Sequence, residues 1–442
     1  MKMKAWSMAT LILLGAISAP AFSQGGGELV MSLEECLSYA KEHSITLQQA
    51  KLDVEDSQVD RATAKSAFLP SLSASASQGF TNSPISSGDI QSSNKYSGSY
   101  GVDLAMNIYN GGENALNLKQ SKLSVEIAKL GMEQDEDVLE VSIAQIYVEI
   151  LYAIEQIEVT KNSIALSEKN IELGDRMLEL GSMNRAEYAQ LLTAQASEEY
   201  NLVVAQNTLR NKYMQLKHLL EITDGTTLKV DSAELNPTSL AIAIPTLEDV
   251  YAVAMSIRPE IASSTLSIES AKLDEKIARA GYLPTLSLSA GVGVNHISGT
   301  AYTFGYQLKD NYSNSIGLNL SVPIFNKFAT RNAVIKSQNA TKYASLTLES
   351  TSKSLYQTIE TLHTNAVNAH AMYMVSQRKL SALEQSLELV TKQYELGRKS
   401  VLDLLTEQDD YRLSSQEYLE SKYTLILNKA LLEYYRTGVI KI

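Results

Sequence analysis

The sequence predicts a mainly α-helical chain with a small β part, built from a duplicated unit of helix, strand, strand, helix and helix. Three observations predict this fold class. Residues 33–73 and 247–287 follow one pattern, each copy changes from helical to strand periodicity at a Leu-Pro pair, and each is followed by a long stretch without proline. A repeat that spans about half of a chain favours one body made of two copies over several unrelated domains.

The two copies match residue by residue at a constant spacing. The matched residues of the first copy are Leu33, Glu34, Ala40, Leu52, Glu55, Asp60, Ala64, Leu69, Pro70, Leu72 and Ser73. The same residue types recur as Leu247, Glu248, Ala254, Leu266, Glu269, Asp274, Ala278, Leu283, Pro284, Leu286 and Ser287. We therefore expect a first structural repeat at 24–222, a linker at 223–246 and a second repeat at 247–442.

The N-terminus has the pattern of a secretory signal peptide. Lys2 and Lys4 precede an apolar run, and small residues follow it, so we expect residues 1–23 to be removed. The formal net charge of -12 at pH 7 argues against nucleic acid as a partner. Cys36 is the only cysteine, which excludes an intramolecular disulfide bond. The sequence therefore predicts an exported, acidic protein.

The first copy is expected to begin with one helix over about residues 32–68. Ser32, followed three residues later by Glu35, is the pattern of a capping box. Pro70 ends the helix, because proline lacks a backbone donor and pushes the preceding residue toward extended geometry. In the second copy Pro259 is expected to break or kink the equivalent helix.

A pair of strands follows the Leu-Pro pair in each copy. Apolar residues alternate with Ser, Gly and Asn, so each strand has one apolar face and one small polar face. We expect the four strands at about 71–80, 96–109, 285–295 and 313–325. A turn-rich stretch at about 81–95 and a loop at about 296–312 are expected to connect the strands of each pair.

Two stretches without proline predict very long helices, at about 113–180 and 328–396. A continuous helix of this length would be roughly 100 Å long. A glycine turn and a returning helix follow each one, at about 185–220 and 401–436. The returning helices carry a column of residues with strict seven-residue spacing, which is typical of supercoiling against a partner helix. The column comprises Tyr188, Gln195, Leu202, Leu209 and Leu216, and then Leu404, Tyr411, Tyr418, Leu425 and Leu432.

The strands have the length and pattern of membrane strands. About ten alternating residues can cross a bilayer when tilted, and in lipid only a closed barrel satisfies the backbone of strands. Four strands are too few, because membrane barrels begin at about eight, so we expect the chain to assemble with copies of itself. The alternative, a soluble sheet with one solvated face, does not explain helices of this length. The aromatic residues near the strand ends, where interfacial belts occur, are Phe80, Tyr96, Tyr100, Tyr109, Tyr302, Phe304 and Tyr312.

This order of parts resembles the TolC-like outer membrane efflux protein family. The resemblance rests on the signal peptide, the duplication, the two Leu-Pro pairs, and Ile108-Tyr109-Asn110-Gly111-Gly112 or Pro323-Ile324-Phe325-Asn326 after each returning strand. It implies a homotrimer with a 12-stranded β-barrel in the lipid of the outer membrane, a long α-helical barrel in the periplasm, and an equatorial belt. It also implies an exit duct for an inner-membrane transporter, joined to it by a periplasmic adaptor protein.

The resemblance further implies an aperture at the far tips of the long helices. Tyr394 stands three residues before Gly397, as the family's gate tyrosine does, and Lys399 occupies the place of a gate arginine. Lysine lacks the planar fork of arginine, so this departure should weaken a latch. The alternative is that Tyr394 only packs in a core and that Lys399 only offsets a helix dipole.

Acidic residues near the same turns complete the candidate aperture. Glu187 matches the family's acidic partner in the first copy, and Asp403 matches the first acid of its constricting ring. Thr406 replaces the second acid, and Glu407, one helical turn from Asp403, is the candidate substitute. A ring of carboxylates would favour cations. The alternative is a solvated helix face.

The resemblance alone implies that the helix tips contact the adaptor. The residues concerned are Leu180, Gly181, Ser182, Leu396, Gly397 and Arg398.

The leading interpretation is an exit duct for small toxic molecules or drugs. A type I protein-secretion duct and a non-channel coiled-coil protein of the envelope are the alternatives. An enzyme is not expected, because the five histidines are scattered, no Gly-rich phosphate loop occurs, and Cys36 has no plausible triad. We expect no cofactor and no metal site. The sequence does not identify the cargo, the class of pump or the adaptor.

Overall fold

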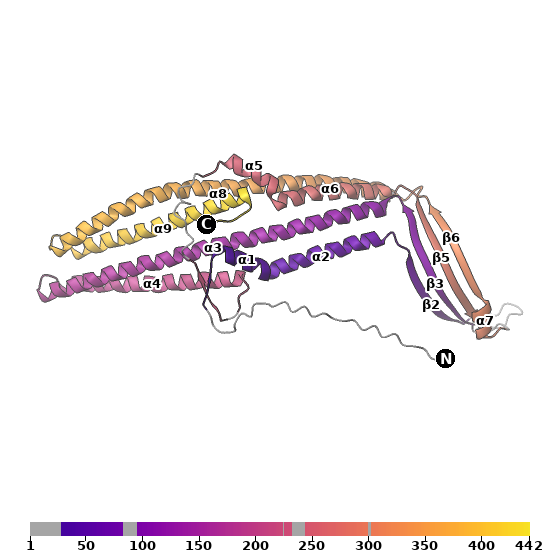
Figure 1. Ribbon diagram of the computed structural model, residues 1–442, viewed down its shortest axis with the longest axis horizontal. Coiled ribbons are helices and arrows are strands. Elements are labelled where there is room, and N and C mark those ends of the chain that lie inside the picture. The colour runs from indigo at the N-terminus through magenta and orange to yellow at the C-terminus, as the bar shows by residue number, and fades with distance from the viewer. Residues whose placement is uncertain (1–27, 83–94, 224, 232–243, 299–301) are drawn as a thin grey trace.

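The computed structural model describes residues 28–82, 95–223, 225–231, 244–298 and 302–442. They form an elongated molecule with a sheet at one end and two helical hairpins that reach the other end (Figure 1). The expected signal peptide, most of the stretch at 81–95 and part of the linker at 223–246 lie outside the described residues. Within the described part, no helix is both long enough and apolar enough to cross a membrane.

The two halves of the chain contain helices of matching length. The first half has α1 (Leu33–His43), α2 (Ile45–Ser66), β2 (Ser71–Thr81), β3 (Lys95–Asn110), α3 (Glu113–Glu179) and α4 (Arg185–Leu219). The second has α5 (Leu247–Ile257), α6 (Pro259–Ala280), β5 (Thr285–Ile297), β6 (Tyr312–Ser321), α8 (Ala329–Glu395) and α9 (Val401–Thr437). Helices α1 and α5 have 11 residues each, α2 and α6 have 22, and α3 and α8 have 67. The mainly helical fold class with a small sheet part is confirmed, as are the two very long helices.

The prediction of one helix over residues 32–68 is wrong at one point. The chain breaks between α1 and α2 at Ser44, whose Oγ accepts a hydrogen bond from the Leu47 N–H at 3.4 Å and so caps α2. The second half breaks at the matching place, where Pro259 is the first residue of α6. The break predicted from proline is therefore confirmed, and a capping serine makes the same break in the first half.

The four long strands form one antiparallel sheet in the order β2-β3-β5-β6. Residues directly opposite each other share a face, so the register decides what each face carries. One row across the sheet is apolar and consists of Leu72, Leu104, Ala290 and Ile316. A row on the opposite face is small and polar and consists of Ser75, Gly101, Gly293 and Ser313. The chain leaves the apolar face uncovered at Ile316, whose side chain is 83% exposed.

Two expectations for the sheet need correction. The sequence predicts a strand to about residue 325, but β6 ends at Ser321. The strand ends early because Pro323 has no N–H for a ladder bond. The loop expected at 296–312 contains a short helix, α7 (Phe304–Asp310), capped by the Thr303 side chain. In the described part of the chain β2 and β6 each pair with one strand, so both are edge strands.

Each long helix carries two shorter helices along its length. α3 packs against α2 near the sheet and α4 near the tip, and α8 packs in the same way against α6 and α9 (Figure 1). Contacts of α3 with α6 and α9 join the two halves. All ten residues of the predicted seven-residue column are buried or half-buried, which confirms its packing role.

The largest apolar core lies near the middle of the molecule. It surrounds Tyr147, which is buried and whose hydroxyl donates to the Asp231 carbonyl at 2.8 Å. Two short strands, β1 (Glu28–Met31) and β4 (Thr227–Val230), pair in parallel beside it. The sequence did not predict this pairing, in which β4 lies within the expected linker.

The corner between β3 and α3 gives a test of this packing. Gly111 and Gly112 have positive φ values of 68° and 82°. A Cβ at Gly111 would lie 2.7 Å from the Ala280 carbonyl oxygen of α6, whereas a Cβ at Gly112 would meet nothing within 4 Å. Both alanine variants share the left-handed strain of about 1–2 kcal/mol, but only Gly111→Ala adds a collision.

We expect Gly111→Ala to lower the free energy of unfolding by about 1–3 kcal/mol more than Gly112→Ala does. Denaturant unfolding of the purified protein measures both losses. Equal losses would contradict the contact between this corner and α6.

Candidate functional site

The two helix-helix turns at the end of the molecule opposite the sheet are built alike (Figure 1). Gly181 and Gly397 both have a φ of 71°. In the first turn the Gly181 N–H donates to the Leu178 carbonyl at 3.1 Å, and the Ser182 N–H donates to the Met177 carbonyl at 2.9 Å. The second turn has the same two bonds, both at 2.8 Å. These left-handed glycines satisfy the last carbonyls of α3 and α8.

Each returning helix restarts at a capping box that contains a candidate aperture acid. The Asn184 N–H donates to Glu187 Oε2 at 3.1 Å, and the Ser400 N–H donates to Asp403 Oδ2 at 3.0 Å. The hydrogen bonds from Ser400, assisted by the charge of Lys399, hold the pKa of Asp403 below its usual value. Lys399 Nζ lies 3.7 Å from Asp403 Oδ1. Both acids thus have a local role at their own turns.

Tyr394 belongs to a small apolar core that both hairpins share. Its side chain is 3% exposed, and the core residues beside it come from the turns and all four tip helices. Burial, and then the charge of Glu187, raises the pKa of Tyr394. Its hydroxyl is buried without a hydrogen-bond partner among the described residues. The fold therefore brings Tyr394 and Glu187 to one region without bonding them.

The remaining candidates occupy different environments. Glu407 is half-buried, whereas Asp403 is exposed. Thr406 donates its hydroxyl to the Leu402 carbonyl of its own helix at 2.8 Å. No three His, Cys, Asp or Glu side chains of the described chain gather where they could hold a metal ion.

The outermost tip residues are apolar and exposed. Leu180 is 83% exposed and Leu396 is 68% exposed. Ser182 donates its hydroxyl to the Met177 carbonyl at 3.0 Å, and Arg398 is exposed.

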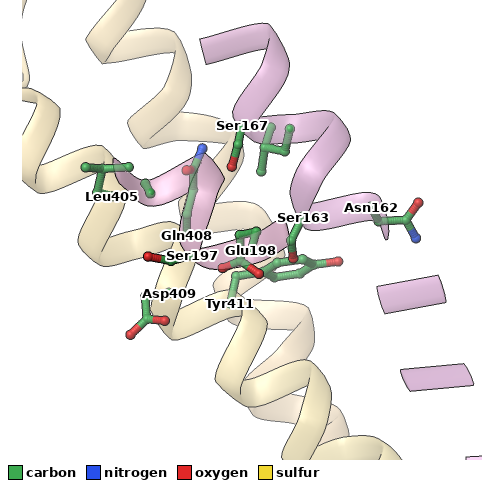
Figure 2. Close-up of a pocket in the computed structure, with 11 residues that line it drawn as sticks. Asn162, Ser163, Ser167, Ser197, Glu198, Leu405, Gln408, Asp409 and Tyr411 are labelled. Carbon is green, nitrogen blue, oxygen red and sulfur yellow. The ribbon is translucent and has the colours of Figure 1, made fainter. Parts of the chain in front are cut away.

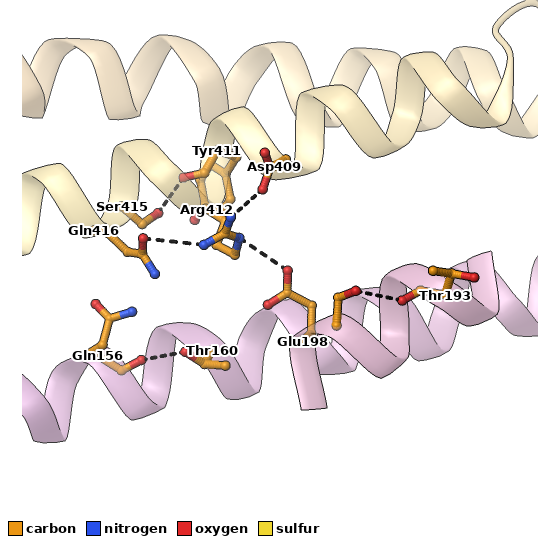
Figure 3. Close-up of polar contacts among 10 residues, drawn as sticks. Gln156, Thr160, Thr193, Glu198, Asp409, Tyr411, Arg412, Ser415 and Gln416 are labelled. Carbon is orange, nitrogen blue, oxygen red and sulfur yellow. Dashed lines mark hydrogen bonds and ion pairs between the residues drawn. The ribbon is translucent and has the colours of Figure 1, made fainter. Parts of the chain in front are cut away.

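A polar layer between the hairpins was missed by the sequence analysis. Arg412 Nε of α9 lies 3.2 Å from Glu198 Oε1 of α4, and each side chain is 16% exposed (Figure 3). Arg412 also contacts Asp409, and it donates to Gln416 Oε1 at 3.4 Å. Burial raises the pKa of Glu198, and the charge of Arg412 opposes this rise. Glu198 Oε2 has no hydrogen-bond partner among the described residues.

A cavity of about 230 Å³ opens beside this ion pair (Figure 2). Most of the residues that line it have polar side chains, and they come from α3, α4 and α9, but apolar atoms form the larger part of its surface. The lining residues are Asn162, Ser163, Leu166, Ser167, Ala194, Ser197, Glu198, Leu405, Gln408, Asp409 and Tyr411. The hairpins are thus separated here by a cavity and joined beside it by an ion pair.

The comparison with protein families decides the classification. The model described as "Outer membrane efflux protein" matches residues 36–220 and 250–433. The chain belongs to the outer membrane efflux protein family. It is accordingly an outer membrane protein of the exit-duct type.

Individual relatives agree with this family. This efflux protein is 23% identical to the outer membrane protein TolC of Escherichia coli (strain K12) over 431 residues, 89% of this chain and 81% of TolC. It is 22% identical to the alkaline protease secretion protein AprF of Pseudomonas aeruginosa over 188 residues, 42% of this chain and 38% of AprF. The solved structure of the outer membrane protein VceC of Vibrio cholerae has the same fold, with a TM-score of 0.75 and 17% identity over 91% of this chain and 96% of VceC.

The raised pKa of Glu198 predicts a pH-dependent effect in the efflux protein. Arg412→Met leaves the Glu198 carboxylate without its cation. At about pH 8 we expect a loss of about 1–3 kcal/mol of unfolding free energy, below the range for fully buried pairs because both side chains are partly exposed. A raised pKa means that ionisation destabilises the fold, so stability is lost as the pH rises through the folded pKa. The loss should therefore shrink toward about pH 5.

Denaturant unfolding at both pH values measures this effect, and the matched control is the double variant Glu198→Gln/Arg412→Met. The control should show no such pH dependence relative to the parent protein. A loss in Arg412→Met that is the same at both pH values would show that Arg412 contributes only packing.

Proposed function

We propose that three copies of this chain form an exit duct for small toxic molecules or drugs, fed by an inner-membrane pump through a periplasmic adaptor. In this proposal the two repeats, 24–222 and 247–442, supply two strands and one helical hairpin each, and the linker at 223–246 joins them. Twelve strands then form a barrel in the outer membrane, and the hairpins form a helical barrel in the periplasm.

The open sheet is the observation that carries this proposal. Its edge strands β2 and β6 each have one neighbour in the described chain, and one of its faces is apolar. Lipid offers no hydrogen bonds to a free strand edge, so the edges need partners. Pairing β2 of one copy with β6 of the next closes three sheets into one barrel of a size known among outer membrane proteins. The row with Ser75 and Gly101 then faces the lumen, and the row with Ile316 faces lipid.

The proposed aperture lies at the helix tips. Its support is the shared core around Tyr394, the nearby charge of Glu187, and the exposure of Asp403 beside Lys399. Three copies bring three Asp403 carboxylates around one axis, with Glu407 one turn behind, which favours cations.

The adaptor is proposed to contact the outermost tips. Leu180 and Leu396 are large apolar side chains exposed at the far ends of the two hairpins, and such exposed groups favour a protein partner. Gly181, Ser182 and Gly397 leave the backbone accessible beside them, and Arg398 adds a charge.

A second candidate function is a duct for protein secretion. The similarity to AprF, a protein named for the secretion of a protease, favours it over 42% of the chain. Family membership argues against the other alternative, a coiled-coil envelope protein without a duct. Loss of export of a small toxic dye on deletion of the gene, with secreted proteins unchanged, would support the drug duct over the secretion duct.

The aperture is tested by single-channel recording in planar bilayers. We expect low conductance and a preference for cations. Asp403→Asn removes the charge but keeps an oxygen that can accept the Ser400 hydrogen bonds, so the cation preference should fall while the protein still folds. Glu187→Gln is the matched comparison, because it makes the same change in the capping box of the other turn, and it should lower the cation preference less than Asp403→Asn does.

Equal changes in cation preference for both variants would contradict a constricting ring formed by Asp403 in particular. A parent conductance like that of an open porin, unaltered by Asp403→Asn or Tyr394→Ala, would contradict an aperture at the tips.

A further inference from the structure

The short helix α7 lies at the end of the sheet that is far from the long helices (Figure 1). Gln78, Gly98 and His296 lie opposite one another in the register, two residues from the row that contains Tyr100. Because strand residues alternate between faces, His296 shares the face of Tyr100 and the apolar row. The centroids of the Phe304 and His296 rings lie 4.7 Å apart in an edge-on arrangement, so α7 covers this face at His296.

Side-chain hydrogen bonds fasten α7 to the end of β5. The Ile297 N–H donates to Gln307 Oε1 at 2.9 Å, and Gln307 Nε2 donates to the carbonyls of Ile297 and Tyr302, both at 3.0 Å. Asn311 Nδ2 donates to the Asn295 carbonyl at 2.7 Å. Gln307 is buried, so α7 is a docked part of the sheet end.

Exposed rings lie on α7 and just before it in the chain. Tyr302, Phe304 and Tyr306 are all exposed, and the rings of Tyr302 and Tyr306 stack with their centroids 5.0 Å apart. Lys309 is exposed on the same helix. Tyrosine has an apolar body and a polar tip, which suits the boundary between lipid tails and water, and lysine suits the phosphate layer.

We propose that α7 is an interfacial anchor that lies in the headgroup layer of the outer leaflet, with its rings against lipid. Lipid is the partner that contacts these rings, because they continue the apolar face that carries Val292 and Ile316. The anchor fixes the depth of the sheet in the bilayer. This inference rests on the proposed function, which turns that face toward lipid.

Tryptophan fluorescence tests the anchor, because Trp6 is the only tryptophan of the chain and lies in the expected signal peptide. Three variants each introduce one tryptophan: Tyr306→Trp on α7, Ile316→Trp on the apolar face, and Tyr200→Trp at an exposed position of α4. The purified proteins are reconstituted in phosphatidylcholine vesicles brominated either near the headgroups or deep in the acyl chains. Acrylamide serves as the aqueous quencher.

We expect shallow bromine to quench Tyr306→Trp more than deep bromine does, and the reverse order for Ile316→Trp. Tyr200→Trp should respond to acrylamide alone. If Ile316→Trp is quenched by bromine while Tyr306→Trp responds to acrylamide alone, the anchor is wrong and the duct stands. If bromine quenches neither, the proposed function itself fails. Protection of Tyr306→Trp from both quenchers would mean that protein covers α7, which also overturns the anchor.

A substitution beneath α7 gives a second, independent test. A Cβ at Gly98 would lie 2.3 Å from His296 Cε1, and the buried imidazole has little room to move. Gly98→Ala should therefore displace α7, and shallow-bromine quenching of Tyr306→Trp should fall toward the value of Tyr200→Trp. The matched control is Gly101→Ala, where the nearest atom is 3.5 Å away and quenching should stay unchanged. Unchanged quenching in Gly98→Ala would show that docking on His296 does not position the anchor.

Discussion

The need to pair every backbone group in lipid is the constraint on which the rest of the molecule depends. In the described chain the sheet has two edges, β2 and β6, and each edge carries a row of N–H and C=O groups without a strand partner. The proposed assembly removes both edges by pairing copies. It also explains why each strand carries a face of Ser, Gly and Asn, since small side chains leave a lumen open. Two 67-residue helices then extend the duct away from the sheet.

The molecule is packed differently at its middle and at its tips. Around Tyr147 the core is large and apolar and takes in both ends of the described chain. Toward the tips the apolar core is smaller, and the hairpins meet through the Glu198–Arg412 ion pair beside a cavity. Buried ion pairs add little net stability, because desolvation offsets their attraction. Local opening should therefore cost least at the tips, which is where the proposed aperture lies.

Much of the fold could be predicted because its signals are local. The long helices follow from periodicity and the lack of proline, and the turns follow from Gly181 and Gly397. The short elements could not be predicted, because tertiary contacts define them: α7 depends on Gln307, and β4 depends on β1. No local signal pairs Glu198 with Arg412, which lie far apart in the sequence.

The acids of the candidate aperture lie beside the two helix-helix turns, and the capping boxes give them a local role there; their role in an aperture stays a prediction. The most direct test of the account asks whether the sheet closes between copies. In a Cys36→Ala background, one cysteine is placed on β2, beginning at Ser75, and one on β6, beginning at Ser315, and both are moved in steps of two residues along the polar face. After oxidation, the account predicts that one register gives disulfide-linked ladders of up to three chains on non-reducing gels, while single-cysteine variants give none. Cross-links only within one chain, or none in any register, would contradict closure by copies.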